Sequence, residues 1–210
     1  MINKKNLFVM ACMICSLWFL PSLQAQTGSS TYKSVVIGTQ EWMVKNLDVT
    51  TFRNGDPITE VTKDLDWKKA GDSKQPAWCY YNNSAGNNDV YGKMYNWWAV
   101  SDPRGLAPAG WRIPTDEDYK KLIEFYLKDK KVAYAALVNG GISGFNAMMG
   151  GWRGSMIGDF KDFFTYTAIY SASDIKGKWG SYFEFNAEFG GVDLRSGGKG
   201  MGGYVRCIKE

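Results

Sequence analysis

The amino-acid sequence predicts an α+β fold, with one or two helices early in the domain and a mainly antiparallel, loop-rich β region after them. Short runs of β-branched and aromatic residues, bounded by turn residues, predict the strands. One segment after Pro114 has clear helical periodicity. Sixteen of the 24 glycines lie at or beyond Gly140, and this glycine-rich part favours short strands joined by turns.

The N-terminus has the features of a secretory signal peptide. Lys4 and Lys5 precede an apolar stretch over residues 7–20, and the small residue Ala25 ends the segment. The apolar stretch is shorter than the ~20 residues of a spanning helix, which makes the alternative of a retained membrane anchor less favourable. We therefore expect cleavage after Ala25, no membrane span in the mature chain, and an exported protein that is periplasmic, on the cell surface or secreted.

This division leaves a signal peptide over 1–25, a flexible polar tail over 26–31 and one domain over 32–210. About 180 residues are enough for a substantial core. Removing the signal leaves 23 basic and 21 acidic residues. Nucleic-acid binding is not expected, because a nearly balanced chain without a long basic run lacks the basic face it requires. The oligomeric state is left open.

The first elements are expected in the following order. Residues 32–37 and 41–44 read as the two strands of a hairpin around a tight turn. Residues 62–76 are mostly polar and predict a surface loop or short helix, with Trp67 as the only aromatic residue. Residues 91–100 carry apolar side chains at helical spacing, which predicts a short buried helix.

The clearest helix begins after Thr115. A threonine N-cap followed by Asp116, Glu117 and Asp118 suits the positive end of a helix dipole. The apolar residues that follow share one face. They are Tyr119, Leu122, Ile123, Tyr126 and Leu127.

Strands are expected again in the glycine-rich part. Residues 157–171 contain five aromatic side chains, and residues 182–185 alternate between aromatic and polar or acidic positions. Residues 204–208 read as a terminal strand.

Two cysteines remain once the signal is removed, Cys79 and Cys207. An even pair in an oxidising compartment is a disulfide candidate. The alternative is two separately buried thiols.

Five local strings in order resemble the Fibrobacter succinogenes major paralogous domain, a family of exported bacterial proteins. The resemblance covers about residues 32–209 and implies a C-type-lectin-like fold, without implying a reaction. Members often carry a cysteine where this chain has Ala107, so Cys79 and Cys207 are left to pair with each other or with nothing. The strings are Ile37-Gly38-Thr39-Gln40-Glu41-Trp42-Met43 with Asn46-Leu47, Cys79-Tyr80-Tyr81-Asn82-Asn83, Tyr91-Gly92-Lys93-Met94-Tyr95-Asn96-Trp97, Pro108-Ala109-Gly110-Trp111-Arg112-Ile113-Pro114-Thr115-Asp116 and Val205-Arg206-Cys207.

The chain contains no histidine, which excludes a Ser-His-Asp triad, a Cys-His pair and an imidazole zinc site. A hydrolase that uses paired carboxylates stays possible. The acidic residues offer no distinctive pair, because residues 116–118 are explained by helix capping, and Glu184 and Glu188 by a strand face. We therefore expect a protein that is not an enzyme. The alternatives are a polysaccharide-acting hydrolase and a structural cell-envelope protein.

No metal or other cofactor is predicted, although calcium is the cofactor to test in a lectin-like domain. The asparagine-rich run over residues 82–89 offers oxygen ligands of the right hardness. The same residues are typical of turns, because Asn, Gly and Asp tolerate left-handed backbone angles. A single acidic residue in the run, Asp89, favours the turn.

The aromatic residues supply the binding hypothesis. Trp and Tyr faces bind sugar rings, and those in the glycine-rich third are expected to lie on long loops. We predict an exported, non-catalytic binding module whose ligand is a glycan or a cell-surface protein, bound between about residues 140 and 200. The candidate ligand-binding residues are Trp152, Arg153, Trp179, Tyr182 and Arg195, whereas Trp42, Trp97, Trp98 and Trp111 are assigned to the core.

Overall fold

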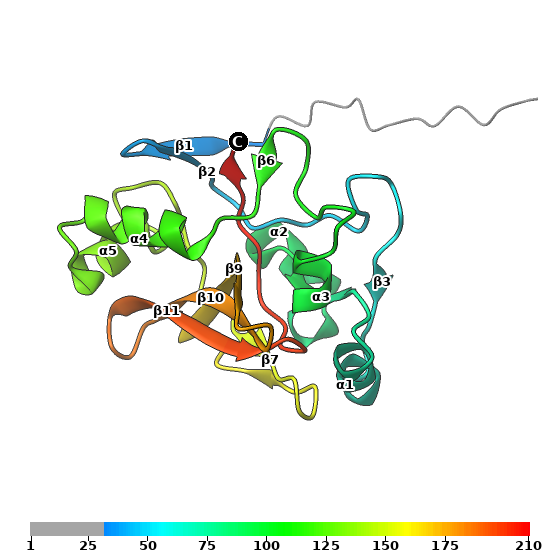
Figure 1. Ribbon diagram of the computed structural model, residues 1–210. Coiled ribbons are helices and arrows are strands. Elements are labelled where there is room, and N and C mark those ends of the chain that lie inside the picture. The colour runs from blue at the N-terminus through cyan, green and yellow to red at the C-terminus, as the bar shows by residue number, and fades with distance from the viewer. Residues whose placement is uncertain (1–31) are drawn as a thin grey trace, which may run out of the picture.

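The structure is a computed structural model that describes residues 32–210 (Figure 1). The signal peptide predicted over 1–25 and the tail over 26–31 lie outside the described residues. The domain is α+β with mainly antiparallel sheets, as the sequence predicts. No helix among residues 32–210 is long and apolar enough to cross a membrane.

The first sheet joins the two ends of the domain. Strands β1 (Ser34–Ile37) and β2 (Gln40–Met43) form the predicted antiparallel hairpin. The C-terminal strand β12 (Ile208–Lys209) lies between β2 and β6 (Trp111–Arg112), which gives the order β1-β2-β12-β6. Figure 1 shows the C-terminus beside this hairpin.

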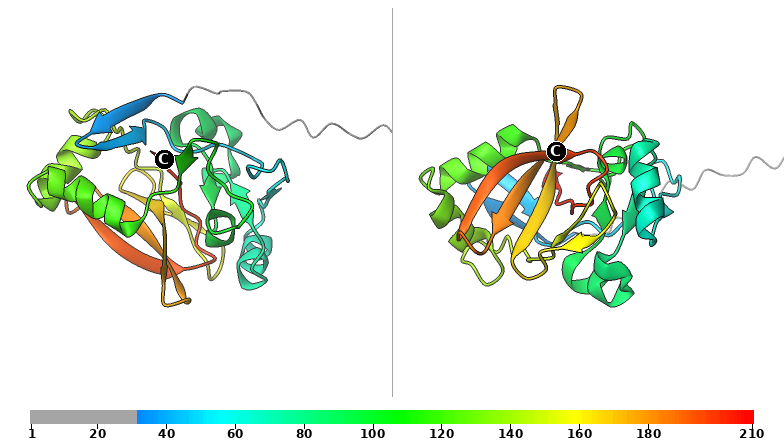
Figure 2. Two further views of the ribbon diagram at one scale, coloured as in Figure 1. Left: turned by 45° about the horizontal axis from the view of Figure 1, so that its top comes forward. Right: turned by 90° about the horizontal axis from the view of Figure 1, so that it is seen from below.

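The second sheet has the order β11-β10-β9 and carries the long strands of the glycine-rich part. Strands β9 (Tyr166–Ile175), β10 (Trp179–Asn186) and β11 (Gly191–Gly198) are antiparallel. The β9–β10 hairpin projects from the body of the domain in both views of Figure 2.

Two helices pack on one face of this sheet. Helix α4 (Asp116–Phe125) begins at the predicted N-cap, where Thr115 and Asp118 form a reciprocal capping box. Tyr119 of α4 stacks on Phe183 of β10, with 4.5 Å between ring centroids. Helix α5 (Lys130–Leu137) follows and was not predicted.

Small elements complete the domain. Residues 62–76 contain helix α1 (Asp64–Asp72), in which Trp67 is fully buried whereas Leu65 is exposed. The other elements are β3 (Thr59–Glu60), β4 (Ala77–Cys79) and β5 (Met94–Tyr95) in a third sheet, β7 (Trp152–Arg153) with β8 (Phe160–Lys161), and helices α2 (Asn88–Tyr91) and α3 (Trp97–Val100).

The single helix expected over residues 91–100 is wrong in its extent. Helix α2 ends at Gly92, whose φ of 75° is outside the helical region. Strand β5 then pairs with β4, and Asn96 caps a new helix by accepting a hydrogen bond from the Ala99 amide. The terminal strand is also shorter than predicted, because only residues 208 and 209 join the sheet.

The predicted disulfide is absent from the structure. Cys79 and Cys207 are both free and fully buried, and they pack in different hydrophobic clusters of the core. Burial raises the pKa of Cys79 to about 11 and that of Cys207 to about 12. The alternative of two separately buried thiols describes the structure.

Candidate functional site

The face of the β9–β11 sheet opposite α4 gathers polar and aromatic side chains. Side chains alternate between the two faces of a strand, so Phe183 and Phe185 enter the core whereas Tyr182 and Glu184 point to the other face. The strand register places Arg195 opposite Tyr182. Sequence segments that are distant along the chain therefore meet on one surface. We call Trp152, Tyr166, Tyr182, Glu184 and Arg195 the sheet-face cluster.

Glu184 is the polar centre of the cluster. Its Oε2 accepts a hydrogen bond from the Tyr166 hydroxyl at 2.9 Å, and its Oε1 accepts one from Arg195 Nε at 3.2 Å. Burial, with Tyr182 and Glu184 close by, raises the pKa of Tyr166, so this hydroxyl stays protonated and donates. The carboxylate is fixed from both sides.

The two charged groups of the cluster differ in exposure. The Arg195 side chain is 55% exposed, whereas that of Glu184 is 13% exposed. Arg195 Nη2 also lies 3.6 Å from Asp193 Oδ2, on the neighbouring position of β11. The guanidinium can therefore donate to a ligand from the surface while the buried carboxylate holds it in place.

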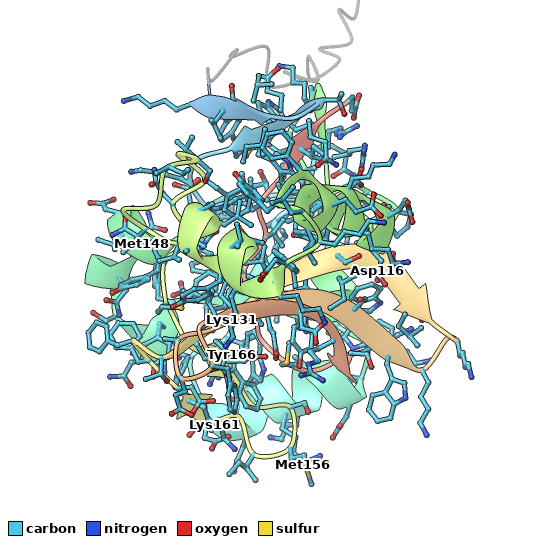
Figure 3. The ribbon with its side chains drawn as sticks, turned by 90° about the vertical axis from the view of Figure 1, so that its left-hand side faces the viewer. Asp116, Lys131, Met148, Met156, Lys161 and Tyr166 are labelled. Carbon is cyan, nitrogen blue, oxygen red and sulfur yellow. The ribbon has the colours of Figure 1, made fainter. Side chains whose placement is uncertain are left out.

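Trp152 lies beside Tyr166 at the border of the sheet. The Gly151 amide donates to the Tyr166 carbonyl at 2.7 Å, and both aromatic side chains pack on the same core cluster. The Trp152 indole nitrogen donates to Asp162 Oδ2 at 2.7 Å, and the Lys161 ammonium lies 5.3 Å from the ring centroid. Figure 3 shows this side of the molecule, with Tyr166 and Lys161 labelled.

Of the five predicted ligand-binding residues, Tyr182 and Arg195 are thus cross-strand partners, and Trp152 packs on the same core cluster as Tyr182. Trp179 lies apart, at the tip of the β9–β10 hairpin, where its side chain is 41% exposed. Tyr166 and Glu184 complete the cluster and were not predicted as site residues. The two-residue alternation from Tyr182 is the signal that places Glu184 on the same face.

Arg153 is wrong as a surface candidate. It has no exposed surface, and its guanidinium lies between the rings of Trp67 and Phe160, 4.6 Å from each centroid. It donates to the backbone carbonyls of Gly158, Val61 and Thr62 at 2.7 to 2.9 Å. A ligand cannot reach this side chain, which instead ties three segments of the core together.

The asparagine-rich run forms its own turns. Asn83 donates to the Thr62 carbonyl at 2.8 Å, and Asn87 donates to the Tyr81 carbonyl at 2.9 Å. Asn88 accepts from the Lys93 ammonium at 3.1 Å. Between residues 32 and 210, no group of three or more acidic or cysteine side chains is placed to hold a metal ion.

A polar pocket of about 380 Å³ lies elsewhere, between β2, β12 and α4. Asp118 lies in the wall of this pocket, and both of its carboxylate oxygens already accept hydrogen bonds from the protein. Arg112 donates to its two oxygens at 2.6 and 2.9 Å, and the Thr115 amide donates at 2.7 Å. Burial alone would raise the pKa of Asp118, but these hydrogen bonds outweigh it and lower the pKa to about 2. Asp118 therefore stabilises the fold at this pocket.

Several polar residues of the family-like strings are internal. Asn46, Asn96 and Arg206 are each at most 9% exposed, and each hydrogen-bonds backbone or side-chain groups of other segments. Folding therefore accounts for these three residues.

Comparison with known proteins gives one match. The family model described as Fibrobacter succinogenes major domain matches residues 35–209, which is most of the chain. No curated protein and no solved structure matches the chain.

Proposed function

We propose that this chain, which belongs to the Fibrobacter succinogenes major domain family, is an exported, non-catalytic binding module with a lectin-like fold that binds a glycan at the sheet-face cluster. The family resemblance supports the lectin-like fold, and the N-terminal signal pattern supports export. Sites on a fold, and not the fold itself, determine function. The proposal therefore depends on the chemistry of the cluster.

The observation that carries the proposal is that Tyr182 and Arg195 are cross-strand partners on one sheet face, with Trp152 packed on the same core cluster as Tyr182. Sugar rings present apolar C–H faces and hydroxyl groups together. Partly exposed aromatic rings match the C–H faces, and a guanidinium beside a carboxylate supplies a donor and an acceptor for hydroxyl groups. Because Tyr166 and Glu184 hold Arg195 in position, the polar groups are pre-organised.

A polysaccharide hydrolase with paired carboxylates is the alternative. Glu184 and Asp193 are register partners on β10 and β11 and supply an acidic pair on this face. Arg195 contacts both, at 3.2 and 3.6 Å, and Lys130 donates to Asp193 at 2.7 Å. Both carboxylates are thereby held in ion pairs, whereas glycoside hydrolysis needs one acid to hold a proton and the other to stay free. This geometry favours binding over hydrolysis.

The test is a glycan-array screen of the purified protein, expressed from the full chain, with calcium and again with chelator. We expect binding that survives chelation. Arg195→Ala and Glu184→Gln should each weaken it by about tenfold, because each removes one charge-assisted hydrogen-bonding group from the site. Lys131→Ala, which changes an exposed cation on α5 that makes no ion pair within residues 32–210, is the matched control and should bind like the wild type.

The other outcomes are equally decisive. Binding to no glycan would reject the glycan as ligand and leave the cell-surface protein as the next candidate. Glycan binding that both cluster variants retain would reject the sheet-face cluster as the site. Cleavage of an array polysaccharide, lost in Glu184→Gln, would establish the hydrolase instead.

A further inference from the structure

The β9–β10 hairpin ends in a basic tip with an exposed tryptophan. Its turn is Lys176-Gly177-Lys178, followed by Trp179. Both lysines are exposed, and neither makes an ion pair within the described part of the chain. The hairpin stands away from the rest of the domain (Figure 2), so these side chains are accessible from several directions.

A second basic and aromatic group, Lys199 with Trp98, lies beside the hairpin. The Lys199 ammonium donates to Asp174 Oδ2 at 2.8 Å and to the Gly177 carbonyl at 3.0 Å, which joins it to the tip. The same ammonium lies 5.4 Å from the ring centroid of Trp98. Trp98 and the hairpin tip are therefore neighbours on one surface.

Lys74 extends this surface beyond the hairpin. Its ammonium lies 5.8 Å from the Trp98 ring centroid, and the Trp98 indole nitrogen is fixed by a 2.8 Å hydrogen bond to the Gly71 carbonyl. We define the lysine–tryptophan strip as Lys74, Trp98, Lys199, Lys176, Lys178 and Trp179. Its members carry four ammonium groups. That of Lys199 is paired with Asp174 and its side chain is 12% exposed, whereas the other three lysines are exposed and make no ion pair within residues 32–210, so they supply the positive charge of the strip.

We propose that the lysine–tryptophan strip binds an acidic polysaccharide, at a site separate from the sheet-face cluster. A uronate-type sugar has a carboxylate on a ring whose C–H face is apolar. Ammonium groups complement the carboxylates, and the two tryptophan rings complement the ring faces.

The order of residues at the tip favours a polysaccharide over a membrane surface. Loops that enter the bilayer interface lead with apolar or aromatic side chains. Here Lys176 and Lys178 occupy the turn and Trp179 follows them, so two ammonium groups precede the ring. Trp98 is half-buried and belongs to helix α3, not to the hairpin. We therefore commit to a soluble or cell-wall polyanion.

The test compares polygalacturonate with its fully methyl-esterified form, which has the same sugar without the charge. Binding of the purified protein, expressed from the full chain, is measured by titration calorimetry at low salt and again at higher salt. We expect binding to polygalacturonate that weakens as salt rises, and no binding to the ester. The Lys176→Gln/Lys178→Gln double variant should bind about tenfold more weakly, because two ion pairs with carboxylates are lost.

Two further variants separate charge from ring stacking and from general surface charge. Trp179→Ala should also weaken binding, while leaving the dependence on salt unchanged. Lys33→Gln/Lys131→Gln removes two exposed lysines outside the strip and should bind like the wild type. The thermal midpoints of all variants should match that of the wild type, because every changed side chain is exposed.

Several results would overturn this inference. One is that the protein fails to bind polygalacturonate or binds the methyl ester equally well. Another is that the Lys33→Gln/Lys131→Gln control loses as much affinity as the Lys176→Gln/Lys178→Gln variant, or that the protein binds vesicles that contain anionic lipid in preference to the polysaccharide. Arg195→Ala and Glu184→Gln distinguish this site from the sheet-face cluster. They should leave polygalacturonate binding intact, so either proposal can fail while the other stands.

Discussion

Arg206 directs two donors at one oxygen of Asn46, at 3.0 Å from Nε and 2.8 Å from Nη2, although 160 residues separate them. The Asn46 amide in turn donates to the Tyr91 carbonyl at 2.8 Å. Arg206 also donates to the Phe145 carbonyl and lies over the Phe145 ring. A cation that is 1% exposed is thus held by an amide, carbonyls and an aromatic face.

Replacing Asn46 by alanine should destabilise the protein by about 3 kcal/mol. The change leaves two donors of a buried guanidinium and one buried carbonyl without partners, and unsatisfied buried groups are costly. Urea unfolding followed by tryptophan fluorescence measures this loss. Asn139→Ala is the control, because Asn139 is exposed and its side chain makes no hydrogen bond within the described domain. A loss no larger than that of the control would mean that Arg206 is not held by Asn46.

Replacing Arg153 by alanine should destabilise the protein strongly, whereas replacing Arg195 by alanine should hardly change its stability. Arg153→Ala should lower the free energy of unfolding by about 3 kcal/mol, because it leaves backbone carbonyls unpaired and a cavity between Trp67 and Phe160. Arg195→Ala should change it by less than about 0.5 kcal/mol, because the side chain is largely exposed. Thermal unfolding of both variants is the measurement. Equal stabilities would contradict the burial of Arg153.

Local patterns explain what the sequence predicted well. The β1–β2 hairpin, the Thr115 N-cap and the alternation from Tyr182 to Phe185 each depend on residues that are close together in the chain. The placement of Tyr182 opposite Arg195 needed the register of a long hairpin, which aromatic content alone does not set. The sequence therefore pointed to the strands on which the candidate cluster lies, without the cluster itself.

Burial of charged residues could not be predicted in the same way. An arginine next to a tryptophan in a glycine-rich segment suggests a surface, but Arg153 finds its carbonyl partners in residues 61 and 62, about ninety positions away. Helix α5 did carry a local signal that was overlooked. Asp129 caps it by accepting from the amides of Lys131 and Val132, and its buried residues share one face.

Cys79 and Cys207 should behave as free thiols in the purified protein. Without reductant, Cys79 and Cys207 should resist iodoacetamide in the native state and both react in denaturant, because they are buried and their raised pKa values keep them protonated. Mass spectrometry of the intact chain counts the added groups. Failure to label in denaturant, with labelling restored by reductant, would show that the two thiols are bonded after all.

Asp118 should make the stability depend on pH in the acidic range. Its pKa in the folded state is about 2, below the ordinary value of 3.8, so the unfolded chain takes up the proton first as pH falls. The stabilisation is therefore complete above about pH 4 and is lost as pH falls towards 2. Between pH 6 and pH 3 the free energy of unfolding of the wild type should fall by about 1 kcal/mol more than that of Asp118→Asn, because the variant has no carboxylate to protonate at this position.

Urea unfolding at both pH values measures this difference. A variant of Glu117, an acidic residue in the same turn of α4, is the control. At pH 6 Asp118→Asn should be less stable than the wild type by about 2 kcal/mol, because Arg112 and the Thr115 amide lose a charged acceptor. Glu117→Gln, an exposed neighbour in α4, should follow the pH dependence of the wild type. Parallel pH profiles for the wild type and Asp118→Asn would mean that Asp118 titrates alike in the folded and unfolded chains. The capping box would then hold α4 by hydrogen-bond geometry, without a contribution from the charge.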